Sequence, residues 1–202
     1  MKGKNILFGG LVILMIAVLS ACGEKKSSDE TDTKVNVEIE TKDNEQETDE
    51  EPGFDRFTAT DLDGNTVTQD IFKDYKLTMI NIWGTFCSPC INEMPELGEL
   101  DKEYKDRGFQ VVGIVIDTYD SNGEIVQSQV DVAKEIVLQT GADYVHILPS
   151  PDIIEAKIKD VTAVPETIFV DSEGNLVGTS YQGAKDKEAW EEVIDGLLEQ
   201  VD

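Results

Sequence analysis

Histidine, cysteine and basic residues are scarce in this sequence, and each shortage excludes a class of protein. One histidine and three cysteines are too few for a zinc cluster of Cys and His ligands or for a scaffold of many disulfides. Only 17 Lys and Arg face 42 Asp and Glu, so the formal net charge is −25. Such a chain lacks a basic face for nucleic-acid phosphates or for anionic lipid headgroups, and we expect no nucleic-acid partner.

The chain of 202 residues is long enough for one ordinary domain with tails. Because 40% of its residues are hydrophobic, this domain can bury a core. The first 21 residues have the pattern of a secretory signal, in which two lysines precede an apolar run over residues 6–19. This run is too short to be a comfortable membrane-spanning helix. It ends in Leu-Ser-Ala-Cys at residues 19–22, which resembles the lipobox of bacterial lipoproteins.

The lipobox resemblance implies that Cys22 carries diacylglycerol and becomes the first residue of the mature chain. The expected location is the cell membrane, lipid-anchored on its extracytoplasmic face. The alternative is an ordinary signal peptide that happens to end in Ala-Cys. Residues 22–53 then read as the lipidated cysteine and an acidic flexible linker, since they hold too few apolar side chains to offset the entropy of ordering.

Strand and helix patterns alternate over residues 54–202, which we predict to be the folded domain. This order predicts an α/β fold with a mixed central sheet, helices on both faces and an N-terminal β-hairpin. The hairpin is predicted over residues 57–68, strands over 75–83, 109–117, 164–170 and 176–181 with a short apolar piece at 146–148, and helices over 91–107, 127–140, 152–159 and 185–201.

Two cysteines three residues apart, Cys87 and Cys90, stand where a predicted strand passes into a predicted helix. On the first helical turn their Cα atoms lie about 5–6 Å apart, within reach of a disulfide. The helix N-terminus lowers the pKa of the Cys87 thiol, which makes Cys87 the expected nucleophile and Cys90 the resolving thiol. A structural disulfide or half of a zinc site is the alternative. The first closes only a tiny loop, and for the second only His146 offers a further ligand.

Residues 83–90 (WGTFCSPC), followed by Glu93, Met94, Pro95 and Leu97, resemble the thioredoxin-like membrane-anchored thiol-disulfide reductases related to the bacterial cytochrome c maturation reductases. A second stretch, residues 161–171 (VTAVPETIFVD), resembles the cis-proline landmark of that fold. The resemblance covers about residues 54–200 and implies a thioredoxin-like fold without a cofactor. It also implies a CxxC dithiol that reduces disulfides in client proteins, and a membrane electron donor of the thiol-transfer type.

The resemblance assigns further roles residue by residue. Pro165 matches the cis-proline that faces the disulfide, and Val164 belongs with it to the loop that pairs with the client chain. Glu93 matches a glutamate beside the buried thiol that adjusts its proton affinity, although a glutamate in the first helical turn also suits the helix dipole. Trp83 and Phe86 complete the expected substrate-binding set, with packing beneath the turn as the plainer role for Trp83.

Several positions depart from the resembled pattern or leave another function open. Asn81 stands where thioredoxin itself carries a buried acid, which shifts proton handling toward Glu93. Glu166, directly after the proline, is expected to repel acidic clients, and His146 is expected to be structural. One alternative is a non-catalytic copper-binding lipoprotein, which wants a longer cysteine spacing and an added histidine. Another is a peroxiredoxin-type thiol peroxidase, which wants a threonine where Gly84 stands.

Overall fold

A mixed five-stranded sheet forms the centre of residues 53–201, the part of the chain that this computed structural model describes. Its strands lie in the order β5-β4-β3-β6-β7. The first three are parallel to one another, β6 runs antiparallel to β3, and β7 runs antiparallel to β6. The strands are β3 (Leu77–Trp83), β4 (Phe109–Val115), β5 (Val145–Ile147), β6 (Glu166–Val170) and β7 (Tyr181–Gln182).

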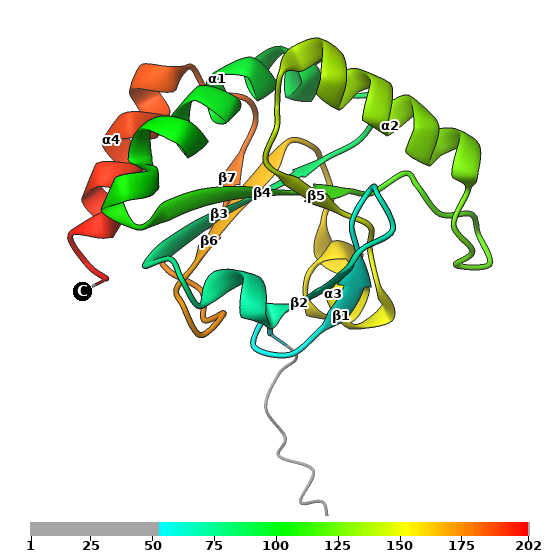
Figure 1. The fold of residues 1–202 in the computed structure, drawn as a ribbon, viewed down its shortest axis with the longest axis horizontal. Helices are drawn as coiled ribbons and strands as arrows, with labels where there is room; N and C mark the ends of the chain where they lie inside the picture. The colour runs from blue at the N-terminus through cyan, green and yellow to red at the C-terminus, as the bar shows by residue number, and fades with distance from the viewer. Residues whose placement is uncertain (1–52, 202) are drawn as a thin grey trace, which may run out of the picture. The chain divides into compact units, whose positions relative to one another are not determined.

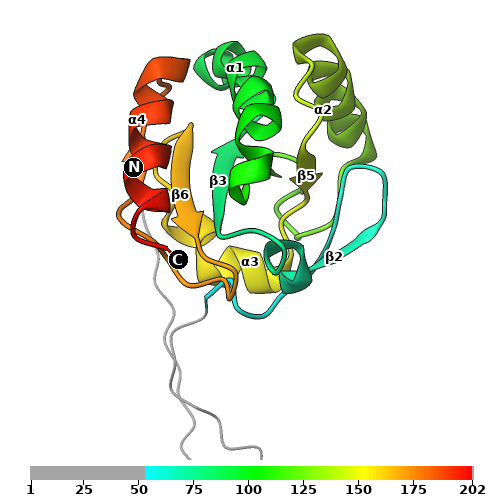
Figure 2. The same cartoon turned by 60° about the vertical axis from the view of Figure 1, so that its left-hand side comes forward.

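Helices cover both faces of this sheet, as the sequence predicts (Figures 1 and 2). One face carries α1 (Ser88–Tyr104), α2 (Gln127–Thr140) and α4 (Lys187–Leu198). The other carries α3 (Pro151–Ala156) and the hairpin of β1 (Thr58–Thr60) and β2 (Thr66–Thr68). The thioredoxin-like fold class is therefore confirmed. Short 3-10 turns lie at Gln69–Phe72, Lys105–Arg107 and Ile158–Asp160.

The central strand β3 is buried along its whole length, and its side chains alternate between two apolar clusters. Leu77, Met79 and Trp83 join the cluster beneath α1. Ile80 and Ile82 join the cluster on the opposite face. Asn81 has the same parity as Trp83, so it is a polar residue on the face that α1 covers.

Most predicted elements are confirmed with small shifts at their ends. Helix α1 begins at Ser88, three residues before the predicted start, because Cys87 already acts as its N-cap. The strand predicted over residues 176–181 is wrong for most of its length. Leu176 forms only an isolated bridge with Val170, and regular pairing resumes at Tyr181, because the chain turns at Gly178 with φ +73°.

The signal segment, Cys22 and nearly all of the predicted linker lie outside the described residues. Within residues 53–201, no helix combines the length and the apolar character needed to cross a membrane.

Candidate active site

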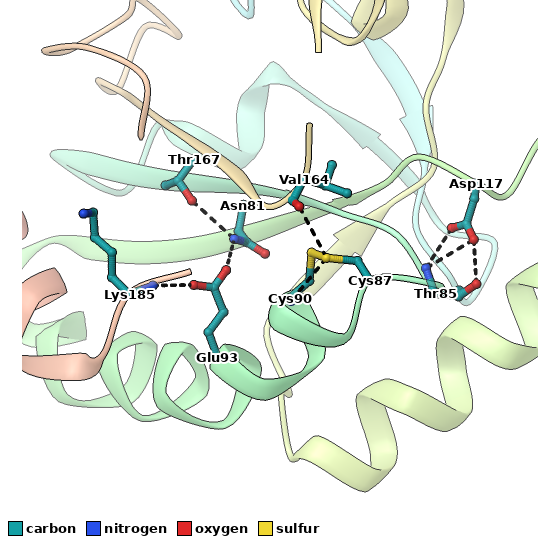
Figure 3. The surroundings of a disulfide bond; sticks show 9 residues. All are labelled: Asn81, Thr85, Cys87, Cys90, Glu93, Asp117, Val164, Thr167 and Lys185. Atoms are coloured by element: carbon teal, nitrogen blue, oxygen red, sulfur yellow. Dashed lines mark hydrogen bonds between the residues drawn. A yellow bond between two sulfur atoms is a disulfide. The ribbon is translucent and has the colours of Figure 1, made fainter. Parts of the chain in front are cut away.

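Cys87 and Cys90 form a disulfide at the N-terminal end of α1 (Figure 3). Their Cα atoms lie 5.3 Å apart, as the sequence spacing predicts. The Cys87 sulfur accepts the backbone N–H of Cys90 at 3.3 Å, so it takes the capping position at the positive end of the helix dipole. Cys87 retains 5% of its surface in solvent and Cys90 none, so Cys87 is the sulfur that an incoming group reaches first.

The predicted proline loop lies directly against this disulfide. The peptide bond between Val164 and Pro165 is cis, which confirms the conformation that the resemblance implies. The Val164 carbonyl oxygen lies 3.6 Å from the Cys87 sulfur (Figure 3). Val164 is half-buried and Pro165 is buried. The outer sulfur therefore faces backbone atoms of the loop that leads into β6.

Glu93 lies one helical turn after Cys90 and points into the interior, with only 3% of its surface exposed. Asn81 donates from Nδ2 to its Oε1 at 3.0 Å, and the backbone N–H of Lys185 donates to its Oε2 at 3.2 Å (Figure 3). Burial raises the pKa of Glu93, while these two hydrogen bonds oppose the rise. The negative charge of Glu96 adds to the rise.

Thr167 shares this buried polar site and was not predicted from the sequence. It lies opposite Asn81 in the antiparallel pairing of β3 and β6, and its hydroxyl accepts from Asn81 Nδ2 at 3.3 Å. The Asn81 Oδ1 atom is buried without a hydrogen-bond partner. The periodicity of the two strands signals a polar residue on each inner face, but it does not place one opposite the other.

Asp117 is a second residue that the sequence prediction missed. Its carboxylate accepts hydrogen bonds from the backbone and the hydroxyl of Thr85, two residues before the first cysteine (Figure 3). Asp117 follows β4 and Thr85 follows β3, which are parallel neighbours. Because the carboxyl ends of parallel strands meet at one edge of a sheet, the residues that follow two such strands can be expected to lie close together. This rule could have indicated the contact between Thr85 and Asp117 from the sequence.

Trp83 takes the packing position and does not reach the surface. Its side chain is fully buried, and its Nε1–H donates to His146 Nδ1 at 3.1 Å. His146 Nε2 lies 3.0 Å from the Ala142 carbonyl, so the neutral ring with its proton on Nε2 satisfies both contacts. Burial lowers the pKa of His146 to about 4. The structural role expected for His146 agrees with this position, whereas client contact by Trp83 does not.

Phe86 and Glu166 lie in opposite environments. Phe86 directly precedes Cys87 in the chain and is 68% exposed. Glu166 retains only 3% exposure and forms an ion pair with Lys157, which corrects the expectation that it repels acidic clients. Its side chain points inward from β6, and Lys157 balances its charge.

A CxxC disulfide that caps a helix and faces a cis-proline loop, on a thioredoxin-like fold, defines the class of thiol-disulfide oxidoreductases. The chain belongs to the Redoxin family, whose pattern matches residues 46–195. Thiol-disulfide oxidoreductase ResA of Bacillus thuringiensis subsp. konkukian is 28% identical over 138 residues, which cover 68% of this chain and 72% of that protein. ResA of Bacillus anthracis is 31% identical over 123 residues, 60% of this chain and 63% of that protein.

Solved structures share the fold. A thioredoxin-family thiol:disulfide interchange protein of Chlorobium tepidum TLS superposes with a TM-score of 0.59 at 24% identity, covering 71% of this chain and 93% of that one. A secreted Mycobacterium tuberculosis disulfide oxidoreductase homologous to E. coli DsbE gives a TM-score of 0.56 at 18% identity, covering 71% and 98%. The Redoxin match and the ResA relatives identify the protein as a thiol-disulfide oxidoreductase with Cys87 and Cys90 as its CxxC pair. Within residues 53–201, no three His, Cys, Asp or Glu side chains gather as metal ligands.

Proposed function

We propose that the protein reduces disulfide bonds of client proteins at the extracytoplasmic face of the cell membrane, where a lipid on Cys22 holds it. The observation that supports this chemistry most directly is the unequal burial of the two sulfurs. Cys87 caps α1 against the proline loop and retains 5% of its surface in solvent, whereas Cys90 retains none. In this proposal a client reacts with Cys87, and Cys90 reacts only with Cys87.

In the first step the Cys87 thiolate attacks one sulfur of the client disulfide. The client S–S bond breaks, a mixed disulfide forms, and the second client sulfur leaves as a thiolate that takes a proton. The capping position stabilises the attacking thiolate because the unpaired N–H groups of the first helical turn point at it.

In the second step Cys90 loses its proton and attacks the Cys87 sulfur. The mixed disulfide breaks, the Cys87–Cys90 disulfide of this structure forms, and the client leaves as a dithiol. Two electrons and two protons pass from the protein to the client in total. Glu93 serves as the proton acceptor for Cys90, since it lies one turn away on α1 and burial raises the pKa of its carboxyl.

The client chain binds along the proline loop and the aromatic side chain beside it. Val164 and Pro165 offer loop backbone next to the reacting sulfur, and Phe86 offers an exposed ring. A membrane electron donor of the thiol-transfer type returns the pair to its dithiol form. No further cofactor takes part in this exchange.

Trapping the mixed disulfide tests the proposal. Cys90→Ser removes the resolving thiol, so we expect clients to remain covalently bound to Cys87 and to be released by dithiothreitol. Cys87→Ser is the matched control and should trap nothing. Insulin reduction should be lost in both variants. A Cys90→Ser protein that binds no client from membrane preparations, while Cys87→Ser does, would reverse the assigned roles.

The lipid anchor has its own test. We expect the mature chain to begin at Cys22 with a diacylglyceryl mass on its first residue and to partition into detergent. Cys22→Ala should release a chain that stays in the aqueous phase. A mature wild-type chain that begins at another residue would overturn the anchor and leave the exchange chemistry untouched.

A further inference from the structure

The turn that leads into Cys87 is held by a carboxylate from the neighbouring strand. The Thr85 N–H lies 3.0 and 3.2 Å from the two carboxylate oxygens of Asp117, and the Thr85 hydroxyl donates to Oδ2 at 2.5 Å (Figure 3). Gln129 of α2 donates from Nε2 to the same oxygen at 3.3 Å. One half-buried carboxylate thus joins the active-site turn, the end of β4 and the first turns of α2.

The register of the sheet places this carboxylate. Trp83 and Val115 are the last paired residues of β3 and β4, and the Ile116 N–H donates to the Trp83 carbonyl at 2.9 Å. Thr85 and Asp117 each follow their strand by two residues, so they leave the sheet side by side. Asp117 is therefore fixed by the buried centre of the fold, and Thr85 takes its position from it.

The turn that Thr85 belongs to presents both the exposed aromatic ring and the outer sulfur. The Phe86 ring folds back over Gly84 so closely that a Cβ added there would lie 2.6 Å from a ring atom. The Cys87 N–H donates to the Gly84 carbonyl at 3.0 Å, so the nucleophile closes the same turn. A shift at Thr85 would move the Phe86 ring and the Cys87 sulfur together.

We propose that Asp117 is a positioning residue for client reduction, which acts through Thr85 to fix the turn that presents Cys87 and Phe86 to a protein disulfide. The inference rests on the proposed function in one respect, since it takes Phe86 as a client contact. A large client must dock on this surface before exchange, whereas a small disulfide needs only access to the sulfur. The loss of Asp117 should therefore slow the first reaction more than the second.

The experiment compares single-turnover reduction of insulin and of bis(2-hydroxyethyl) disulfide, a small neutral disulfide, by the pre-reduced full chain. Asp117→Ala should lower the insulin rate constant by about fivefold or more and the small-disulfide rate constant by less than about twofold. A docked protein holds its disulfide in one position, so a displaced Cys87 sulfur reacts slowly with it, whereas a small disulfide can follow the displaced sulfur. Asp117→Asn keeps one acceptor oxygen for Thr85 and should fall between wild type and alanine. Thr85→Val removes the hydroxyl donor and keeps the N–H donor, so it should also fall between wild type and Asp117→Ala.

Asp101→Ala is the matched control. Asp101 lies on α1, and its carboxylate accepts the backbone N–H of Val111 in β4 at 2.8 Å, away from the active-site turn. Asp101→Ala should lower stability without separating the two rates, and circular dichroism should show both alanine variants folded. Equal loss of both rates in Asp117→Ala, or the same separation in Asp101→Ala, would overturn the proposal.

Phe86→Ala separates this inference from the proposed function. We expect it to lower the insulin rate constant alone, and to add little in combination with Asp117→Ala. If Phe86→Ala changes nothing while Asp117→Ala still separates the two rates, Phe86 is not a client contact and Asp117 acts through the position of Cys87. If Asp117→Ala changes neither rate while Cys90→Ser still traps clients, the proposed function stands and the positioning role falls.

Discussion

Glu93 and Glu166 are buried to the same degree, each with 3% of its surface exposed, but their partners differ. Glu166 forms an ion pair with Nζ of Lys157, so the two charges balance one another inside the protein. Glu93 is held by two neutral N–H groups, from Asn81 and Lys185, and none of the ion pairs found within residues 53–201 involves it. The comparison separates a buried carboxylate whose charge a cation balances from one that is held by neutral donors alone.

The difference has a physical cause in the two elements that carry these residues. Lys157 follows α3 and reaches β6 from the face opposite α1, where it meets Glu166. On the α1 face, β3 offers an amide at Asn81, which cannot neutralise a carboxylate. A negative charge on Glu93 therefore stays uncompensated, and burial raises the pKa of its carboxyl. This arrangement suits a group that accepts a proton from Cys90 and later returns it.

The largest effect is expected where the balanced pair is broken. Lys157→Met keeps an unbranched apolar side chain of nearly the same length but leaves Glu166 buried without its cation. We expect the free energy of unfolding to fall by about 3–5 kcal/mol, the usual cost of a lone buried charge. Urea denaturation at neutral pH measures it. The double variant Lys157→Met/Glu166→Gln removes both charges and should recover most of the loss. A single variant as stable as wild type would show that the pair contributes nothing.

A smaller effect is expected at His146, the buried base beside Trp83. Its pKa is lowered by burial to about 4, whereas an exposed histidine has one of about 6.5. Between these values the unfolded chain binds a proton that the folded chain does not, so stability should fall as pH drops from 6.5 toward 4. The linkage amounts to about 3 kcal/mol at most.

His146→Gln tests this linkage because glutamine offers Trp83 an acceptor oxygen but does not titrate. The variant should be less stable than wild type at pH 7.5, and the difference between the two should shrink by roughly 2 kcal/mol at pH 4.5. Other groups titrate equally in both proteins and cancel. A difference that stays constant between the two pH values would mean that folding does not lower the pKa of His146.

Local sequence patterns were sufficient for the parts of the site that lie within one stretch of chain. The strand-to-helix position of Cys87 and Cys90 follows from an apolar run, a Ser-Pro step and helical spacing. The inward direction of Glu166 could not be predicted, because it depends on the side-chain alternation that begins after the cis peptide bond and on Lys157 nine residues earlier. The Thr85–Asp117 contact depends on register between two strands, which their separate hydrophobic patterns do not fix.

The smallest effect is expected at Glu93, where a substitution tests directly how this carboxylate differs from Glu166. Glu93→Gln removes the uncompensated charge and retains an oxygen for Asn81. Burial raises the pKa of Glu93 in the folded protein above its ordinary value of 4.5, so the folded chain holds this proton more tightly than the unfolded chain does. The free energy of unfolding that this adds is fully present below pH 4.5 and is lost as pH rises through the folded-state pKa. The stability of Glu93→Gln relative to wild type should therefore increase with pH above 4.5.

The same substitution should also change the chemistry of the dithiol. With the negative charge removed, the thiolate absorbance transition should move to lower pH, while insulin reduction near pH 7 should slow by roughly threefold because Cys90 loses its proton acceptor. Glu99→Gln is the matched control, since it removes an equal charge from the exposed side of α1, where Glu99 pairs with Lys187. Circular dichroism establishes that both variants are folded. If Glu93→Gln and wild type give superimposable absorbance transitions and rate profiles, Glu93 is only a structural acceptor for Asn81 and Lys185, since it lies beyond the first turn of α1 where an acid would complement the dipole, and its difference from Glu166 has no part in disulfide exchange.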